Sequence, residues 1–162
     1  MTGSRPSECG MVFWDLKSRI EMKRAEISQL RKMTVGLKGM DSDRVQTSTT
    51  GDKTGTIAIR IVTAEEELAQ LERDYCRMLS EINRLIGTVT DTRERIDLTY
   101  RIVTQYSGAA VAEELSRLTG ERISDRQERR IYNRAVQNLD CAGWTDDFAW
   151  LSKKTKEFLQ KS

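Results

Sequence analysis

The sequence contains no histidine, a single proline and three cysteines, Cys9, Cys76 and Cys141. Without histidine the chain lacks the commonest general base, any Ser–His or Cys–His nucleophile pair and a conventional zinc site. The cysteines are odd in number, far apart and show no CxxC spacing. The chain also has no glycine loop of the kind that cradles phosphates. We therefore expect a protein that is not an enzyme and that needs no cofactor or metal.

Long apolar runs are also missing. No stretch approaches the length that crosses a bilayer, and the N-terminal residues lack an apolar signal core. We therefore expect no membrane contact and a reducing compartment, the cytoplasm. The 27 Lys and Arg nearly balance the 25 Asp and Glu, for a net charge of +2. A strong nonspecific nucleic-acid binder is usually more basic than this.

The high content of charged residues and the spacing of the apolar residues predict an all-α protein. Charged residues make up 32% of the chain, a composition typical of long exposed helices. One stretch carries an a/d heptad seam with alternating steps of four and three. Its members are Ile57, Ile61, Ala64, Leu68, Leu71, Tyr75, Met78, Ile82, Leu85 and Val89. An earlier stripe, interrupted by Lys23 and Thr34, consists of Phe13, Leu16, Ile20, Ile27, Leu30 and Leu37. We expect a long antiparallel coiled-coil hairpin over residues 8–90, able to pair with a second copy.

A polar connector, DRVQTSTTGDKTG, separates the two stripes at residues 43–55. Gly36 and Gly39 predict the end of the first helix, which gives a tip loop over 39–56. This loop is longer than a tight helix–helix turn requires. Two interpretations remain open: the loop contacts a partner, or its Asp and Ser residues only close and cap the hairpin.

The pattern changes after Val89 to short helices. Asp91 predicts the N-cap of a helix that ends near Val103, and the next helix lies between Gly108 and Gly120. Ser124 and Gln127 form a capping box that starts a helix over 124–139. A last amphipathic helix, with Thr145 as its cap, lies within 141–162. We thus expect three parts: residues 8–90, 91–140 and 141–162.

Part of this region resembles the DNA-binding domain of sigma-factor region four. The match lies in ISDRQERRIYNRAVQNL, at Ser124, Arg134–Ala135 and Leu139, with VAEEL at 111–115 as the preceding helix. The resemblance implies a helix-turn-helix with the 124–139 helix in the major groove. Two features depart from the family pattern: the turn SRLTGERIS is long, and Glu128 stands where a small apolar residue is preferred.

The connector resembles the loop of a second family. DRVQTSTTGDK is similar to the loop of Gram-positive phage and prophage proteins that join a helical hairpin to a sigma-like helix-turn-helix. Those proteins are often grouped with phage late-gene transcriptional regulators. The resemblance implies a phage-encoded transcriptional regulator that binds duplex DNA in the cytoplasm of the bacterial host. We expect it to form oligomers through the hairpin, because two helices alone bury little surface.

The DNA-contacting side chains that the resemblance implies lie at the start of the 124–139 helix. Arg and Gln are suitable for DNA contact, because Arg binds guanine and phosphate through hydrogen bonds and Gln binds adenine. The candidates are Arg122, Arg126, Gln127, Arg129, Arg130 and Arg134. A structural interpretation also stands: a solvated face, on which Glu128 relieves repulsion between Arg126 and Arg130.

A different function is also open for the same chain. A phage-encoded helical protein of balanced charge can act as an inhibitor or adaptor that binds a host protein. The host partner would be RNA polymerase or a nucleic-acid-guided defence nuclease, the latter as for an anti-CRISPR protein. The contact residues would then be those of the connector: Asp43, Arg44, Gln46, Thr47, Ser48, Asp52 and Lys53.

Overall fold

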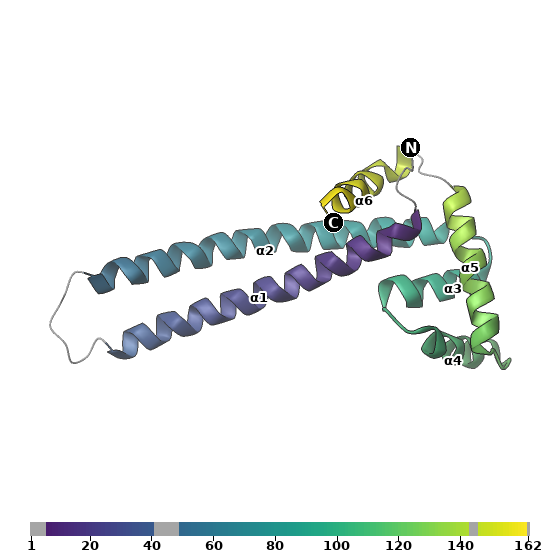
Figure 1. The fold of residues 1–162 in the computed structure, drawn as a ribbon, viewed down its shortest axis with the longest axis horizontal. Coiled ribbons are helices and arrows are strands. Elements are labelled where there is room, and N and C mark those ends of the chain that lie inside the picture. The colour runs from purple at the N-terminus through teal and green to yellow at the C-terminus, as the bar shows by residue number, and fades with distance from the viewer. Residues whose placement is uncertain (1–5, 41–48, 143–145, 162) are drawn as a thin grey trace. The chain divides into compact units, whose positions relative to one another are not determined.

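The structure of the protein is a computed structural model, shown in Figure 1. It describes the backbone of residues 6–40, 49–142 and 146–161, and side chains within 6–36, 53–140 and 147–161. These residues contain six α-helices and no strand, so the all-α prediction is confirmed. The α-helices are α1 (Cys9–Met40), α2 (Thr49–Gly87), α3 (Thr92–Leu98), α4 (Gly108–Thr119), α5 (Asp125–Ala142) and α6 (Ala149–Lys161). Short 3-10 helices, η1 (Pro6–Glu8) and η3 (Asp146–Phe148), and a π-helix, η2 (Thr99–Val103), accompany them.

The chain divides into two compact units. The paired-helix unit is Asp15–Tyr75, and the helix-cluster unit combines Met1–Trp14 with Cys76–Ser162. Both long helices therefore contribute to both units. The predicted domain boundaries at 90/91 and 140/141 stay predictions.

Both long helices extend further than the sequence indicated. α1 continues through Gly36 to Met40, and α2 begins at Thr49, so residues 39–40 and 49–56, expected in the connector, are helical. A single glycine costs a helix only about 1 kcal/mol relative to alanine, too little to end a helix that side-chain packing stabilises. The connector expected over 39–56 is shortened accordingly.

In the paired-helix unit, α1 and α2 lie side by side and antiparallel (Figure 1). As the residue number rises on α1 it falls on α2, because Arg24 pairs with Glu72 and Arg31 pairs with Glu65. Lys23, which interrupts the apolar stripe, is only 22% exposed at its side chain and bridges Glu26 and Glu67, each at 2.7 Å. Of the two predicted apolar stripes, Leu16, Ile20, Ile27 and Leu30 of α1 and Ala64 of α2 are buried in this unit. Five other members of the α2 stripe are only half-buried: Ile57, Ile61, Leu68, Leu71 and Tyr75.

In the helix-cluster unit α3 and α4 pack against α5, and η2 packs against α3 and α4. Asp91 caps α3, since its Oδ1 accepts hydrogen bonds from the N–H groups of Arg93 and Glu94 at 2.8 and 3.1 Å. A core forms beneath α4 and α5 from Val111, Ala112, Leu115 and Ile123, with Ile131 packed against it. This core fixes which side of α5 faces inward.

The C-terminal helix α6 joins the same unit. Cys9 Sγ and Thr155 Oγ1, both buried, lie 3.5 Å apart. Burial raises the pKa of the Cys9 thiol to about 12, so this thiol stays protonated at neutral pH and is a poor nucleophile. The guanidinium groups of Arg77 and Arg84 stack over Trp150 and Phe148, with 4.2 and 4.7 Å to the ring centroids. Trp150 therefore contributes to packing.

Two kinds of feature are absent from the described residues. None of the helices in these ranges combines the length and apolarity needed to cross a membrane. The same ranges contain no group of three or more Cys, Asp or Glu side chains placed to hold a metal ion.

Candidate nucleic-acid interface

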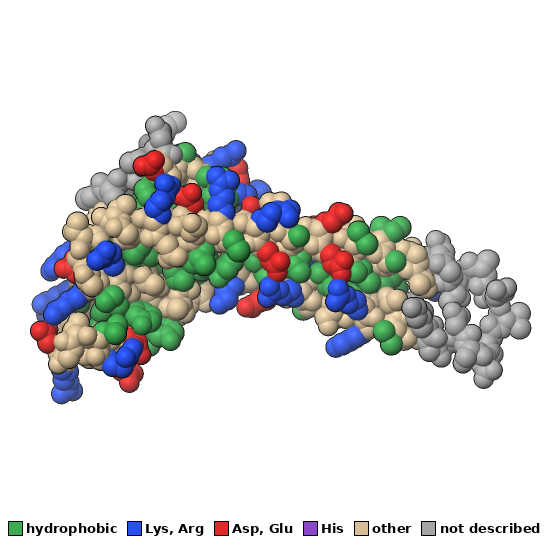
Figure 2. All heavy atoms as spheres, turned by 180° about the vertical axis from the view of Figure 1, so that it is seen from behind, with side chains coloured by type: hydrophobic (Ala, Val, Ile, Leu, Met, Phe, Trp, Pro, Cys, Tyr) green, Lys and Arg blue, Asp and Glu red, His purple; other side chains and the backbone are tan. Residues whose placement is uncertain are grey.

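The predicted contact residues lie on the solvent side of α5 and on the turn before it. Arg122, Arg126, Arg129 and Arg130 are all exposed. Within α5, Arg126 and Arg130 are four residues apart and so lie one turn apart on one face, with Arg129 beside them. In Figure 2, Lys and Arg side chains project from the edge that α4 and α5 form. The structure therefore brings the predicted arginines together on one surface.

The opposite side of α5 buries a charge. Glu128 is 2% exposed and its Oε1 accepts hydrogen bonds from Arg101 Nε and a terminal nitrogen, at 2.9 and 2.6 Å. The side chain of Glu128 consequently lies away from Arg126 and Arg130. The structural interpretation in which Glu128 relieves repulsion between these two arginines is wrong. Glu128 lies on the same buried face of α5 as Ala135 and Leu139, opposite to the two arginines.

Burial of Glu128 changes the charge balance of the exposed surface. Residues 121–134 contain five arginines against Glu121, Asp125 and Glu128. Two of these acids are paired with arginines from outside the segment, since Glu128 binds Arg101 and Glu121 binds Arg93 at 2.9 Å. The excess of positive charge on this surface is therefore larger than the sequence count indicates.

Most of these arginines lack an ion-pair partner within the described part of the chain. Among the described residues, none of Arg122, Arg126, Arg129 and Arg130 lies in a salt bridge, whereas Arg117, on α4, binds Glu114 at 2.7 Å. Arg134 differs from the other four, because its Nε lies 3.8 Å from the buried carboxylate of Glu94. An arginine without an acidic partner retains its donors for an incoming anion such as phosphate.

Gln127 has a structural role at the start of α5. Its Oε1 accepts hydrogen bonds from the N–H and hydroxyl of Ser124, both at 2.9 Å, and its own N–H points to Ser124 Oγ at 3.4 Å. This is the capping box expected from the sequence. Base reading by Gln127 stays a prediction that requires opening the cap.

Two amide side chains on this surface were missed by sequence reasoning. Asn133 and Gln137 follow Arg126 and Arg130 in steps of three and four, which continues the same face of α5. Both are exposed and neither side chain has a hydrogen-bond partner in the described part of the chain. The helical spacing from Arg126 was the signal that would have identified them. Amide side chains can contact adenine with two hydrogen bonds.

The turn before α5 is held in place by α4. Gly120 ends α4 with φ of 72°, a left-handed conformation that favours glycine. The N–H of Ile123 donates to Ser116 Oγ at 2.8 Å, and Ser116 Oγ donates to Ala112 O at 2.7 Å. The long turn therefore has an internal hydrogen-bond network that fixes where α5 begins.

Beneath the exposed face, a second carboxyl lies next to Glu128. Asp97 of α3 is fully buried and neither of its carboxyl oxygens has a hydrogen-bond partner among the described residues. Burial and the neighbouring Glu128 carboxylate raise the pKa of Asp97 to about 7, against a smaller lowering by Arg101. Protonation turns one Asp97 oxygen into a donor, for which Glu128 is the adjacent acceptor. The interaction between Asp97 and Glu128, on the inner side of α5, therefore depends on whether Asp97 is protonated.

Gly108 makes room for this buried cluster. A methyl group added there would lie 2.5 Å from a terminal nitrogen of Arg101 and 3.0 Å from Glu128 Oε2. We expect Gly108→Ala to destabilise the helix-cluster unit by about 1–3 kcal/mol, because the guanidinium group of Arg101 must shift from its position against the Glu128 carboxylate.

Urea unfolding followed by circular dichroism measures this effect. Gly55→Ala is the control, since a methyl group at Gly55 in α2 has no neighbour within 4 Å. We expect Gly55→Ala to stabilise the chain by about 0.5–1 kcal/mol. Equal effects of both substitutions would show that Gly108 does not make room for Arg101.

The predicted connector residues are mostly outside the described side chains. Asp43, Arg44, Gln46, Thr47 and Ser48 lie in 41–48, and the side chain of Asp52 is also outside the described ranges. Lys53 is exposed on the second turn of α2. Contact of the connector with a partner stays a prediction.

Comparison with known proteins gave no match. No protein-family model, curated protein or solved structure matches this chain.

Proposed function

We propose that this chain is a DNA-binding transcriptional regulator that reads duplex DNA with the exposed face of α5. The observation that carries the proposal is the set of exposed arginines on α5 and the preceding turn that have no ion-pair partner among the described residues, Arg122, Arg126, Arg129 and Arg130. Carboxylates three or four residues away on the same helix can pair with exposed arginines and stabilise the helix. Here two of the three nearby carboxylates are bound elsewhere.

The proposed contacts divide by chemistry. Arg126 and Arg130, at the leading end of α5, have the reach and donor geometry for guanine edges or phosphates. Asn133 and Gln137, which continue this face, supply amide groups suited to adenine. Arg122 and Arg129, at the sides, are placed for phosphate contact. The resemblance to sigma-factor region four and to phage regulators supports the same orientation, with the first turns of α5 in the major groove.

The experiment is fluorescence-anisotropy titration of labelled duplexes across a salt series. If all four arginines contact phosphates, log Kd should rise with log salt concentration with a slope of about 3 to 4, and the slope should be smaller by about one for each arginine that contacts a base instead. Absence of binding at about 50 mM salt, where phosphate contacts are strongest, would contradict the proposal.

A second candidate is a protein-binding inhibitor or adaptor that acts on a host protein such as RNA polymerase or a nucleic-acid-guided nuclease. It is favoured by exposed apolar side chains on the paired-helix unit, Val35, Ile59 and Val62 at 72, 69 and 54% exposure. A groove of about 590 Å³ also lies on this unit, lined by Ile27, Leu68 and basic residues of α1. A tight complex with a host protein that substitutions on α5 leave unchanged would favour this candidate. Either function places the chain in the cytoplasm of a bacterial host.

A further inference from the structure

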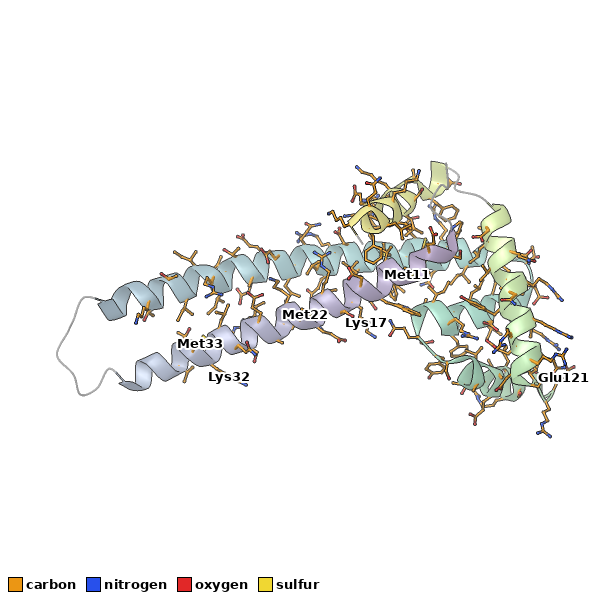
Figure 3. The ribbon with its side chains drawn as sticks, viewed as in Figure 1. Met11, Lys17, Met22, Lys32, Met33 and Glu121 are labelled. Carbon is orange, nitrogen blue, oxygen red and sulfur yellow. The ribbon has the colours of Figure 1, made fainter. Side chains whose placement is uncertain are left out.

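One face of α1 in the paired-helix unit is exposed and carries no charge. It follows helical steps of three and four along the side of α1 that faces away from the buried stripe. Its members are Ser18, Met22, Ala25, Gln29, Met33 and Gly36, and we call them the α1 outer face. Met22 and Met33 are 72% and 56% exposed, and both are labelled along α1 in Figure 3. An uncharged exposed strip with two large apolar side chains is typical of a surface that another helix covers.

The α1 outer face is nearly the same when read in either direction. Its two methionines lie five and six residues from residue 27, and the small residues Ser18 and Gly36 lie nine residues from it at the two ends. A second copy of α1 that runs antiparallel about residue 27 would therefore place Met22 within one residue of the partner's Met33. Ala25 would then lie against the partner's Gln29. Such self-complementarity is what a two-fold symmetric interface requires.

The charges that border this face fit the same arrangement. Glu21 and Lys32 lie on one border, and neither forms an ion pair within the described part of the chain, whereas Arg19, Lys23, Arg24 and Arg31 all do. In the antiparallel register about residue 27, Glu21 of each copy lies within one residue of the position opposite Lys32 of the other. On the other border Glu26 approaches its own symmetry copy, but Lys23 of the same chain already binds it at 2.7 Å.

We propose that the α1 outer face is a homodimer interface in which two copies of α1 pack antiparallel about residue 27. Met22 and Met33 form the apolar contacts, and two Glu21–Lys32 ion pairs fix the direction. Opposite charges at such bordering positions select partner and orientation in helical pairs. The proposal does not rest on DNA binding, and its test contains no DNA.

The test is the molar mass by sedimentation equilibrium at increasing concentrations of the full chain. The wild type should form a dimer, and Met22→Glu/Met33→Glu should weaken association at least tenfold. Ile59→Glu/Val62→Glu is the matched control, because it adds the same two charges at exposed apolar positions of α2. It should dimerise as the wild type does. Circular dichroism verifies that both variants remain helical.

Charge exchange tests the direction. Lys32→Glu should weaken the dimer, because it places two glutamates opposite each other, and Glu21→Lys/Lys32→Glu should restore it. A wild type that is monomeric at all concentrations, or a dimer that Met22→Glu/Met33→Glu leaves intact, would overturn the interface. A dimer that the double exchange does not restore would overturn the antiparallel register.

Discussion

Replacing Arg126 and Arg130 together by alanine should weaken binding to a preferred duplex by about 100-fold or more. Each arginine that contacts a guanine or a phosphate contributes about 1–3 kcal/mol, and the two side chains lie one turn apart on the same exposed face. Because neither is in a salt bridge of the described chain, their removal breaks no internal ion pair there. We therefore expect the loss to fall on DNA affinity and not on stability.

A double arginine substitution on α2 is the control for this prediction, compared in both affinity and salt slope. Arg60→Ala/Arg73→Ala removes the same charge from exposed positions of α2 and should change affinity less than about threefold. The salt slope should fall by about one for each phosphate that α5 no longer binds and remain unchanged in the control. Equal losses of affinity in both variants would indicate a general charge effect and contradict a specific role for α5.

Asn133→Ala/Gln137→Ala separates base contacts from phosphate contacts. Because these amides carry no charge, their removal should relax sequence preference and leave the salt slope unchanged. The measurement is anisotropy with the preferred duplex and with duplexes that carry single base-pair changes. Unchanged discrimination among those duplexes would assign these amides no part in base recognition.

Asp97→Asn should stabilise the protein at pH 8, by about 2–4 kcal/mol. The pKa of Asp97 is raised to about 7 in the folded protein, while an unfolded Asp titrates near about 3.9. Between these values the folded state holds a proton that the unfolded state has released. Stability therefore falls as the pH rises from about 4 to 7, by up to about 1.4 kcal/mol per pH unit.

Asparagine avoids this loss because it is neutral at every pH and its amide can donate to Glu128. The groups that face Asp97 are Glu128 of α5 and Arg101 of η2, so the substitution also removes a repulsion between two carboxylates. Urea unfolding from pH 4 to 8 should show a flatter profile for Asp97→Asn than for the wild type. Asp15→Asn, at a carboxylate whose side chain is 39% exposed, is the control substitution, and an equal flattening of the profile in both variants would contradict a specific role for Asp97. Destabilisation by Asp97→Asn at all pH values would contradict a protonated Asp97.

Local signals in the sequence predicted much of the helical structure. Asp91, Gly120 and the Ser124–Gln127 pair mark helix ends where the structure has them, because capping involves residues within one turn of each other. The buried stripe of α1 also follows from periodicity alone. Gly36 shows the limit of such signals, since the surrounding residues continue α1 through it.

The inner side of the candidate interface could not be predicted in this way. Glu128 binds Arg101, which lies 27 residues earlier, and helical periodicity gives no indication of that pair. The π-helix that carries Arg101 has no sequence signature either. Burial of Glu128 leaves the arginines of α5 as the dominant charges of the exposed face. Tertiary contact, not local spacing, decides the electrostatics of this surface.

The most direct test of α5 as a DNA-reading helix is selection from a library of random duplexes, with the wild type and Arg126→Ala/Arg130→Ala in parallel. The wild type should enrich one consensus sequence, and the variant should enrich none or one with relaxed positions. Absence of enrichment by the wild type, or the same consensus from both proteins, would contradict DNA reading by this face.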